Sequence, residues 1–273
     1  MGVRLQNTPA LRAVAWRDLR KASVTQTVRG LLLTPPWLVL SLVLAQDGLL
    51  ALALPVSAVF FMAGLRQAHD GFHRTLGLPR GANDGFLFLL SLLMGVPLHA
   101  VKYNHLHHHA HPLAPDDIEG ACARLPGWLA VASGPLFTVR MLLHAFGKAR
   151  GKAFAWMVGE AAALVAVGAV AVWSECYWLR YHLVVMLLGN CLTGFFAVWL
   201  VHHHCDPSAL YARTQRGWLV NSLTLNLLYH LEHHLFPAVP ACRLPELARR
   251  IDTAFPAASS LPVVGLRRTR RCT

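Results

Sequence analysis

The stretch HLHHHAH at residues 105–111 decides how this sequence is interpreted. Within it, His105, His108 and His109 have the spacing i, i+3 and i+4, which places three side chains on one stripe of a helix. Packing alone gives no reason for such a stripe, because a buried imidazole must find a hydrogen-bond partner. The stretch therefore predicts a helix that presents metal ligands.

Three other segments carry histidines at related spacings. The stretch YHLEHH at residues 229–234 repeats the HxxHH pattern, and HDGFH at residues 69–73 places two imidazoles four residues apart. A run of three histidines at residues 202–204 ends an apolar segment, and His202 continues that segment directly. Residues three and four apart share a helical face, so each segment can direct its imidazoles to one point.

These segments together supply nine candidate ligands. Sites of neutral imidazoles suit zinc, copper, iron or nickel. One metal ion cannot use nine imidazoles, whereas two ions with four or five each can. The predicted metal ligands and catalytic residues are His69, His73, His105, His108, His109, His202, His230, His233 and His234.

Composition indicates a membrane protein. Hydrophobic residues make up 55% of the 273 residues and charged residues only 14%, whereas soluble domains carry about 25% charged residues. A membrane-spanning helix needs about 20 mostly apolar residues. Four segments meet that requirement, at about residues 31–48, 49–68, 153–173 and 181–201.

Two further apolar stretches, at about residues 84–101 and 125–147, are too short or too interrupted to span. Gly95 and Pro97 break the first stretch, and Gly134 with Pro135 breaks the second. Short apolar helices of this kind suit the membrane interface. We therefore expect residues 1–273 to form one all-α integral membrane domain, with four transmembrane helices, interfacial helices and a cytoplasmic histidine-rich cap.

The basic residues predict the orientation of the chain. Of the 25 lysines and arginines, Arg180 alone lies in the turns at the far ends of these spans. Because cytoplasmic loops collect lysine and arginine, both termini and the histidine segments should be cytoplasmic, with a bacterial inner membrane as the expected location. The net charge of +12 comes without any nucleic-acid-binding motif, so nucleic acid is not an expected partner.

The stretch NLLYHLEHHLFP at residues 226–237, followed by Pro240 and Leu244-Pro245, is similar to the third histidine box of the membrane fatty acid desaturase and hydroxylase superfamily. With the order of the other boxes, the resemblance covers roughly residues 68–251. It implies a four-span fold with the boxes beneath the membrane, two iron ions, and oxygen as co-substrate. It also implies a membrane lipid or lipid-like substrate, and an external electron donor such as a ferredoxin or a cytochrome.

Groups that hydrogen-bond to the imidazoles should fix their tautomers. The acidic candidates are Asp70, Asp116, Asp117 and Glu232. Members of this superfamily often place an asparagine near the end of the fourth span, which residues 199–201 do not offer. Asn226, four residues before His230, is the candidate substitute.

Three functions are compatible with the sequence. The YHLEHHLFP tail favours a fatty acyl desaturase, while the short chain and the compact HLHHHAH segment also resemble carotenoid ketolases. A carotenoid ketolase or hydroxylase, or another lipid hydroxylase, is therefore the main alternative. A metal transporter is a remote alternative, because transporters place polar ligands in mid-membrane and these histidines lie at the ends of spans.

Overall fold

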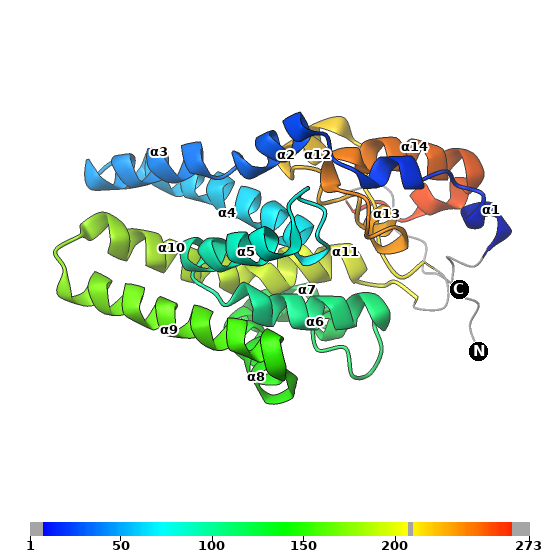
Figure 1. Cartoon of the computed structure of the whole chain (residues 1–273). Helices are drawn as coiled ribbons and strands as arrows, with labels where there is room; N and C mark the ends of the chain where they lie inside the picture. The colour runs from blue at the N-terminus through cyan, green and yellow to red at the C-terminus, as the bar shows by residue number, and fades with distance from the viewer. Residues whose placement is uncertain (1–7, 207–209, 264–273) are drawn as a thin grey trace.

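The computed structural model describes residues 8–206 and 210–263. Within these ranges the chain is nearly all helical, with one isolated bridge between Thr214 and Pro262 and no strand (Figure 1). The elements are α1 (Pro9–Arg12), η2 (Arg17–Arg20), α2 (Val24–Leu31), α3 (Pro35–Gln46), α4 (Leu50–Phe72), α5 (Arg80–Met94), α6 (Leu98–Ala110), η3 (Gly120–Arg124), α7 (Gly127–Ala132), α8 (Gly134–Lys148), α9 (Gly151–Trp173), α10 (Tyr177–Thr193), the π-helical η4 (Gly194–Trp199), α11 (Leu200–His202), α12 (Trp218–Leu223), α13 (His230–Leu235), η5 (Ala241–Arg243), α14 (Leu244–Ala254) and η6 (Pro256–Ser260).

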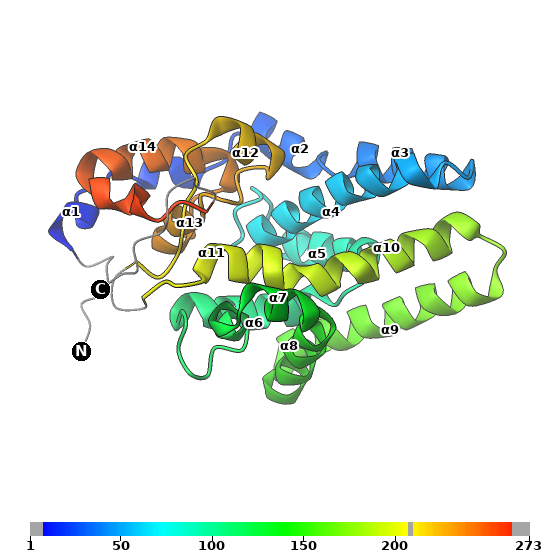
Figure 2. The ribbon, with the colours of Figure 1, turned by 180° about the vertical axis from the view of Figure 1, so that it is seen from behind.

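Four segments of the described chain are long and apolar enough to cross a membrane. They form two hairpins, α3–α4 and α9–α10, which extend to the same side, away from α13 and α14 (Figures 1 and 2). The prediction of an all-α fold with four spanning helices is confirmed. The segments are Val24–Gln46, Leu50–Phe72, Gly151–Trp173 and Tyr177–His202.

The first hairpin depends on a tight turn and on polar contacts between its helices. Gly48 ends the turn with φ of +74°, a left-handed conformation that glycine adopts without steric cost. Ser41 Oγ and Ser57 Oγ lie 2.6 Å apart across the hairpin, and Thr34 Oγ1 donates to Gln67 Oε1 at 2.9 Å. These bonds satisfy hydroxyls that would otherwise face apolar surroundings.

The interrupted stretch at residues 84–101 belongs to two helices, which begin before it and end after it. Helices α5 and α6 meet at an angle of 111°. Gly95 ends α5 in a left-handed conformation with φ of +68°, and Pro97 directly precedes α6, as expected at a helix stop. The stretch at 125–147 is likewise divided, into α7 and α8, at Ser133. Because of the bend, α6 runs in a different direction from α5.

A buried carboxylate fixes the start of α6 against α9. Glu160 Oε1 accepts hydrogen bonds from Ser91 Oγ and from His99 Nδ1, both at 2.6 Å. Glu160 Oε2 accepts from the backbone N–H of His99 at 3.0 Å, in the first turn of α6. One side chain of a spanning helix therefore holds the helix that carries the HLHHHAH segment.

We expect Gly134→Ala to destabilise the protein strongly. A methyl group at this position would lie 1.7 Å from the carbonyl oxygen of Cys191 in α10, which is backbone and cannot turn away. Overpacking of this kind costs about 1–3 kcal/mol. Thermal denaturation of the detergent-solubilised protein measures the effect. Gly147→Ala is the matched control, because Gly147 also lies in α8 and a methyl group added there would meet no atom of another element within 4 Å. Equal melting temperatures for the two variants would contradict this packing.

Candidate metal centre

Four separate parts of the chain bring the nine predicted histidines together. The elements that carry them lie where the spans meet the C-terminal helices α12, α13 and α14, which form the cap (Figure 1). The end of α4 supplies His69, and His73 follows directly. Helix α6 supplies three imidazoles, the end of α11 supplies His202, and α13 supplies three more. The folded chain therefore places every predicted ligand in one region.

The nine imidazoles form two groups, in each of which the candidate ligand nitrogens lie within 4.8 Å of one another. The two HxxHH boxes divide in a reciprocal way. Helix α6 gives its i, i+4 pair to the first group and one residue to the second, while α13 does the opposite. The first group is His69, His73, His105, His109 and His233; the second is His108, His202, His230 and His234.

The spacing of the nitrogens matches that of ligands around a shared ion. In the second group, His202 Nε2 lies 3.1 Å from His108 Nε2 and 2.8 Å from His230 Nε2. In the first group, His109 Nε2 lies 3.0 Å from His233 Nε2. Imidazole nitrogens bind divalent metals at about 2.1 Å, so two ligands at right angles stand about 3.0 Å apart.

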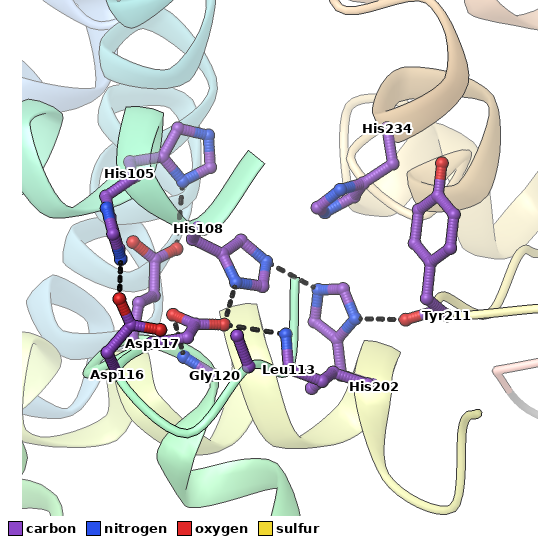
Figure 3. A network of polar contacts seen from close by, with 12 residues as sticks. His105, His108, Leu113, Asp116, Asp117, Gly120, His202, Tyr211 and His234 are labelled. Carbon is purple, nitrogen blue, oxygen red and sulfur yellow. Dashed lines mark hydrogen bonds and ion pairs between the residues drawn. The ribbon is translucent and has the colours of Figure 1, made fainter. Parts of the chain in front are cut away.

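Outer hydrogen bonds fix two tautomers in the second group (Figure 3). His108 Nδ1 donates to Asp117 Oδ2 at 2.7 Å, and His202 Nδ1 donates to the carbonyl oxygen of Tyr211, also at 2.7 Å. A neutral imidazole has one N–H, so both Nε2 atoms carry a lone pair. With both rings neutral, as metal binding requires, these lone pairs face each other at 3.1 Å without a proton between them. The two lone pairs repel each other, and a cation bound by both Nε2 atoms removes that repulsion. These two nitrogens therefore fit a metal ion as ligands.

The first group shows the same chemistry. His105 Nδ1 donates to Glu119 Oε1 at 2.8 Å, which leaves its Nε2 free to coordinate. His69 Nε2 is buried and has no hydrogen-bond partner among the described residues. A buried polar nitrogen without a partner is costly, and a metal bound within the first group would satisfy it.

At the three histidines of α13, burial favours the neutral form that metal binding requires. It lowers the pKa of His230, His233 and His234 well below the usual value, and neighbouring imidazoles lower each pKa further. At Asp117, burial alone would raise the pKa, but the hydrogen bond and charge of His108, together with the backbone N–H groups of Gly120 and Leu113, outweigh it and lower the pKa. At His108, the hydrogen bond to Asp117 and the charges of Glu119 and Asp117 together outweigh burial and raise the pKa. The imidazoles of α13 are therefore held neutral, and the Asp117 carboxylate is held ionised beside His108.

The other residues predicted to hold the nine imidazoles have different partners in the structure. Asp116 is paired with His107 at 3.2 Å and its side chain is 68% exposed. Asp70 accepts from Thr75 Oγ1 and from the backbone N–H of Ala241, both at 3.0 Å.

Two predicted residues near the third box also have partners outside the nine histidines. Glu232 accepts from Thr214 Oγ1 and from Arg216 Nη2, both at 2.6 Å. Asn226 Nδ2 donates to the carbonyl oxygen of Ala241 at 3.3 Å. These bonds attach α13 and the residues before it to the rest of the cap.

Two partners of the imidazoles were not found from the sequence. Glu119 follows Asp117 by two residues, so the pattern of acids just after a histidine box was the available signal. The carbonyl of Tyr211 carries no sequence signal, because any residue has one.

An apolar cavity of about 160 Å³ lies against both histidine groups. His69, His105 and His230 reach it, and apolar side chains from α4, α6, α8, η4 and residues 224–228 form most of its wall. Among its polar wall residues, Glu119 accepts from His105 Nδ1, and Asn190 donates to the carbonyl oxygens of Met94 and Met186, both at 2.8 Å. The cavity therefore suits a hydrocarbon chain rather than a polar ligand.

Comparison with known proteins agrees with this geometry. The sequence model of the fatty acid desaturase family matches residues 47–264, a range that contains all nine histidines. A beta-carotene ketolase from Paracoccus sp. (strain N81106 / MBIC 01143) is 28% identical over 196 residues, which cover 68% of this chain and 74% of the relative. No solved structure matches the chain.

Proposed function

This chain belongs to the fatty acid desaturase family, and we propose that it catalyses oxygen-dependent desaturation of fatty acyl chains at a di-iron centre. The observation that carries the proposal is the pair of histidine groups beside one apolar cavity. The proposed ligands, which are also the catalytic residues, are the nine histidines of the two groups.

The proposed cofactor is a pair of iron ions. When bound, they would supply the oxidising chemistry that removes hydrogen from an unactivated C–H bond, with oxygen as oxidant. In desaturation, the substrate loses two hydrogens and forms a C=C bond, while two external electrons and two protons complete the reduction of oxygen to water. An external donor, a ferredoxin or a cytochrome, supplies those electrons.

The protein's own residues orient the imidazoles, bind the substrate and exclude water. Asp117 and Glu119 hold the protons on Nδ1 of His108 and His105, so that Nε2 of each ring faces its group. The apolar wall of the cavity places a methylene chain beside His69, His105 and His230 and keeps water away from it.

Carotenoid ketolation is the second candidate, because the matched relative from Paracoccus is a beta-carotene ketolase. Ketolation would use the same centre twice on one carbon, with an alcohol as the first product. The apolar cavity accepts either hydrocarbon. We favour acyl desaturation because the YHLEHHLFP tail resembles that of acyl-lipid desaturases.

Orientation is part of the proposal. We place both termini and the histidine groups on the cytoplasmic side of a bacterial inner membrane, supported by the single basic residue, Arg180, in the far turns. This side gives a soluble electron donor access to the cap.

Lipid and pigment profiling tests the reaction. The intact chain is expressed in a plain bacterial host and in a carotenoid-producing host, each beside a His233→Ala control. We expect new unsaturated acyl chains that are absent from the control. A new keto-carotenoid with unchanged acyl chains would reject desaturation in favour of the second candidate. Unchanged lipids and pigments in both hosts would contradict both.

A further inference from the structure

Helix α12 exposes three large apolar side chains although it is not part of any spanning segment. Trp218 is 77% exposed, Leu219 is 54% exposed and Leu223 is 70% exposed. Contiguous apolar surface of this kind marks an interaction with a membrane or a protein.

The opposite face of α12 is firmly attached to the protein. Val220 packs against the buried cluster of Val201, Leu228 and Val263. Asn221 is buried, and its Nδ2 donates to the carbonyl oxygens of Gln215 and Gly217 at 2.8 and 3.1 Å. The apolar side chains therefore project from a fixed helix and not from a loose loop.

The position of α12 along the spans indicates which surroundings it meets. Figures 1 and 2 show α2 and α12 at the same level along the hairpins, where the spans meet the cap. Helix α2 belongs to the first spanning segment and exposes Val24 and Val28 by 81% and 47%. Tryptophan is enriched at this boundary between membrane and water.

The chain that leaves α12 forms one edge of the apolar cavity. Thr224 and Leu227 line the cavity, as do Phe196 and Ala197 of the π-helix in the fourth span. Phe196 is 47% exposed and Ala197 is also exposed, so the cavity wall at the π-helix is also part of the protein surface. Leu225 holds a left-handed backbone with φ of 52°, a conformation that is rare for leucine and concentrated at ligand sites.

We propose that α12 lies in the membrane interface and that the cavity opens sideways into the bilayer, between the end of α12 and the π-helix of the fourth span. A lipid hydrocarbon chain then enters the site from the membrane and not from a soluble carrier. The identity of the substrate rests on the proposed function; the position of α12 in the membrane does not.

Photocrosslinking tests the position of α12 without any assay of activity. The photoreactive residue p-benzoylphenylalanine replaces Leu219 or Leu223 in the full chain, in phosphatidylcholine vesicles whose acyl chains end in an alkyne. We expect lipid adducts at both positions at about the level found for Leu187, which is 62% exposed on α10. Position 249 in α14, where the side chain is 78% exposed, is the control without lipid contact.

Adducts at 219 and 223 no stronger than at 249 would overturn the proposal, and so would adducts with a second protein in place of lipid. If lipid adducts form but no host yields a product, the proposed function fails while the position of α12 stands.

A double substitution tests the route of entry. Leu219→Ser with Leu223→Ser should lower product formation in the profiling host roughly tenfold at equal protein level, through a higher apparent KM. Leu52→Ser with Leu54→Ser is the matched control, since these residues are 57% and 53% exposed on α4 and do not line the cavity. Equal product from the two double variants would contradict entry beside α12.

Discussion

Replacement of His233 by alanine is expected to abolish turnover while the chain still inserts into the membrane. His233 belongs to the first histidine group, is 4% exposed, and has its Nε2 3.0 Å from that of His109. Loss of a group that only orients a ligand costs about 10–100-fold in affinity or activity, so loss of a ligand should cost more than about 100-fold. Product formation per membrane-inserted chain measures the effect.

His144→Ala is the control for that experiment. His144 lies on α8, where its Nδ1 is 2.6 Å from Oδ1 of Asn104, and it belongs to neither histidine group. Its removal should leave product formation within about twofold. Substantial turnover by the His233 variant would mean that this histidine is not a ligand of an essential metal.

Asp117→Asn is expected to lower the metal affinity of the second histidine group, and the activity, about 10–100-fold, the range for the outer partners of ligating histidines. Asp117 accepts hydrogen bonds from His108 Nδ1 and from the backbone N–H groups of Leu113 and Gly120. An asparagine has one acceptor oxygen in place of two, so it cannot satisfy all three donors or fix the His108 tautomer as well. Metal analysis of the purified variant separates loss of metal from loss of turnover.

The neighbouring residue provides a matched control. Asp116→Asn makes the same chemical change one position earlier, but Asp116 contacts His107, outside the two groups, and its side chain is largely exposed. We expect nearly unchanged metal content and activity. Equal losses in the two variants would show that Asp117 has no special role in holding His108.

The helices and the four spans could be predicted because apolar runs of sufficient length have few alternatives in a membrane. Gly95 and Pro97 indicated a break in the stretch at 84–101, but the angle of 111° between α5 and α6 depends on packing. That packing includes the contact of Glu160 with the start of α6, which joins residues far apart in sequence.

The set of histidines could be predicted from spacing, but not their division into two groups. The spacing of His105, His108 and His109 indicates one shared stripe, whereas His108 belongs to a different group from the other two. The sequence also did not indicate which of two adjacent acids contacts an imidazole of the two groups. Asp116 and Asp117 lie in one loop, and the fold of that loop turns Asp117 toward His108.

The most direct test of the central claim is the metal content of the purified chain compared with two variants. The two histidine groups predict about two iron ions per intact chain. His109→Ala in the first group and His234→Ala in the second should each retain about one. One ion per intact chain, or an unchanged content in both variants, would contradict a centre in which two groups of imidazoles each hold one metal.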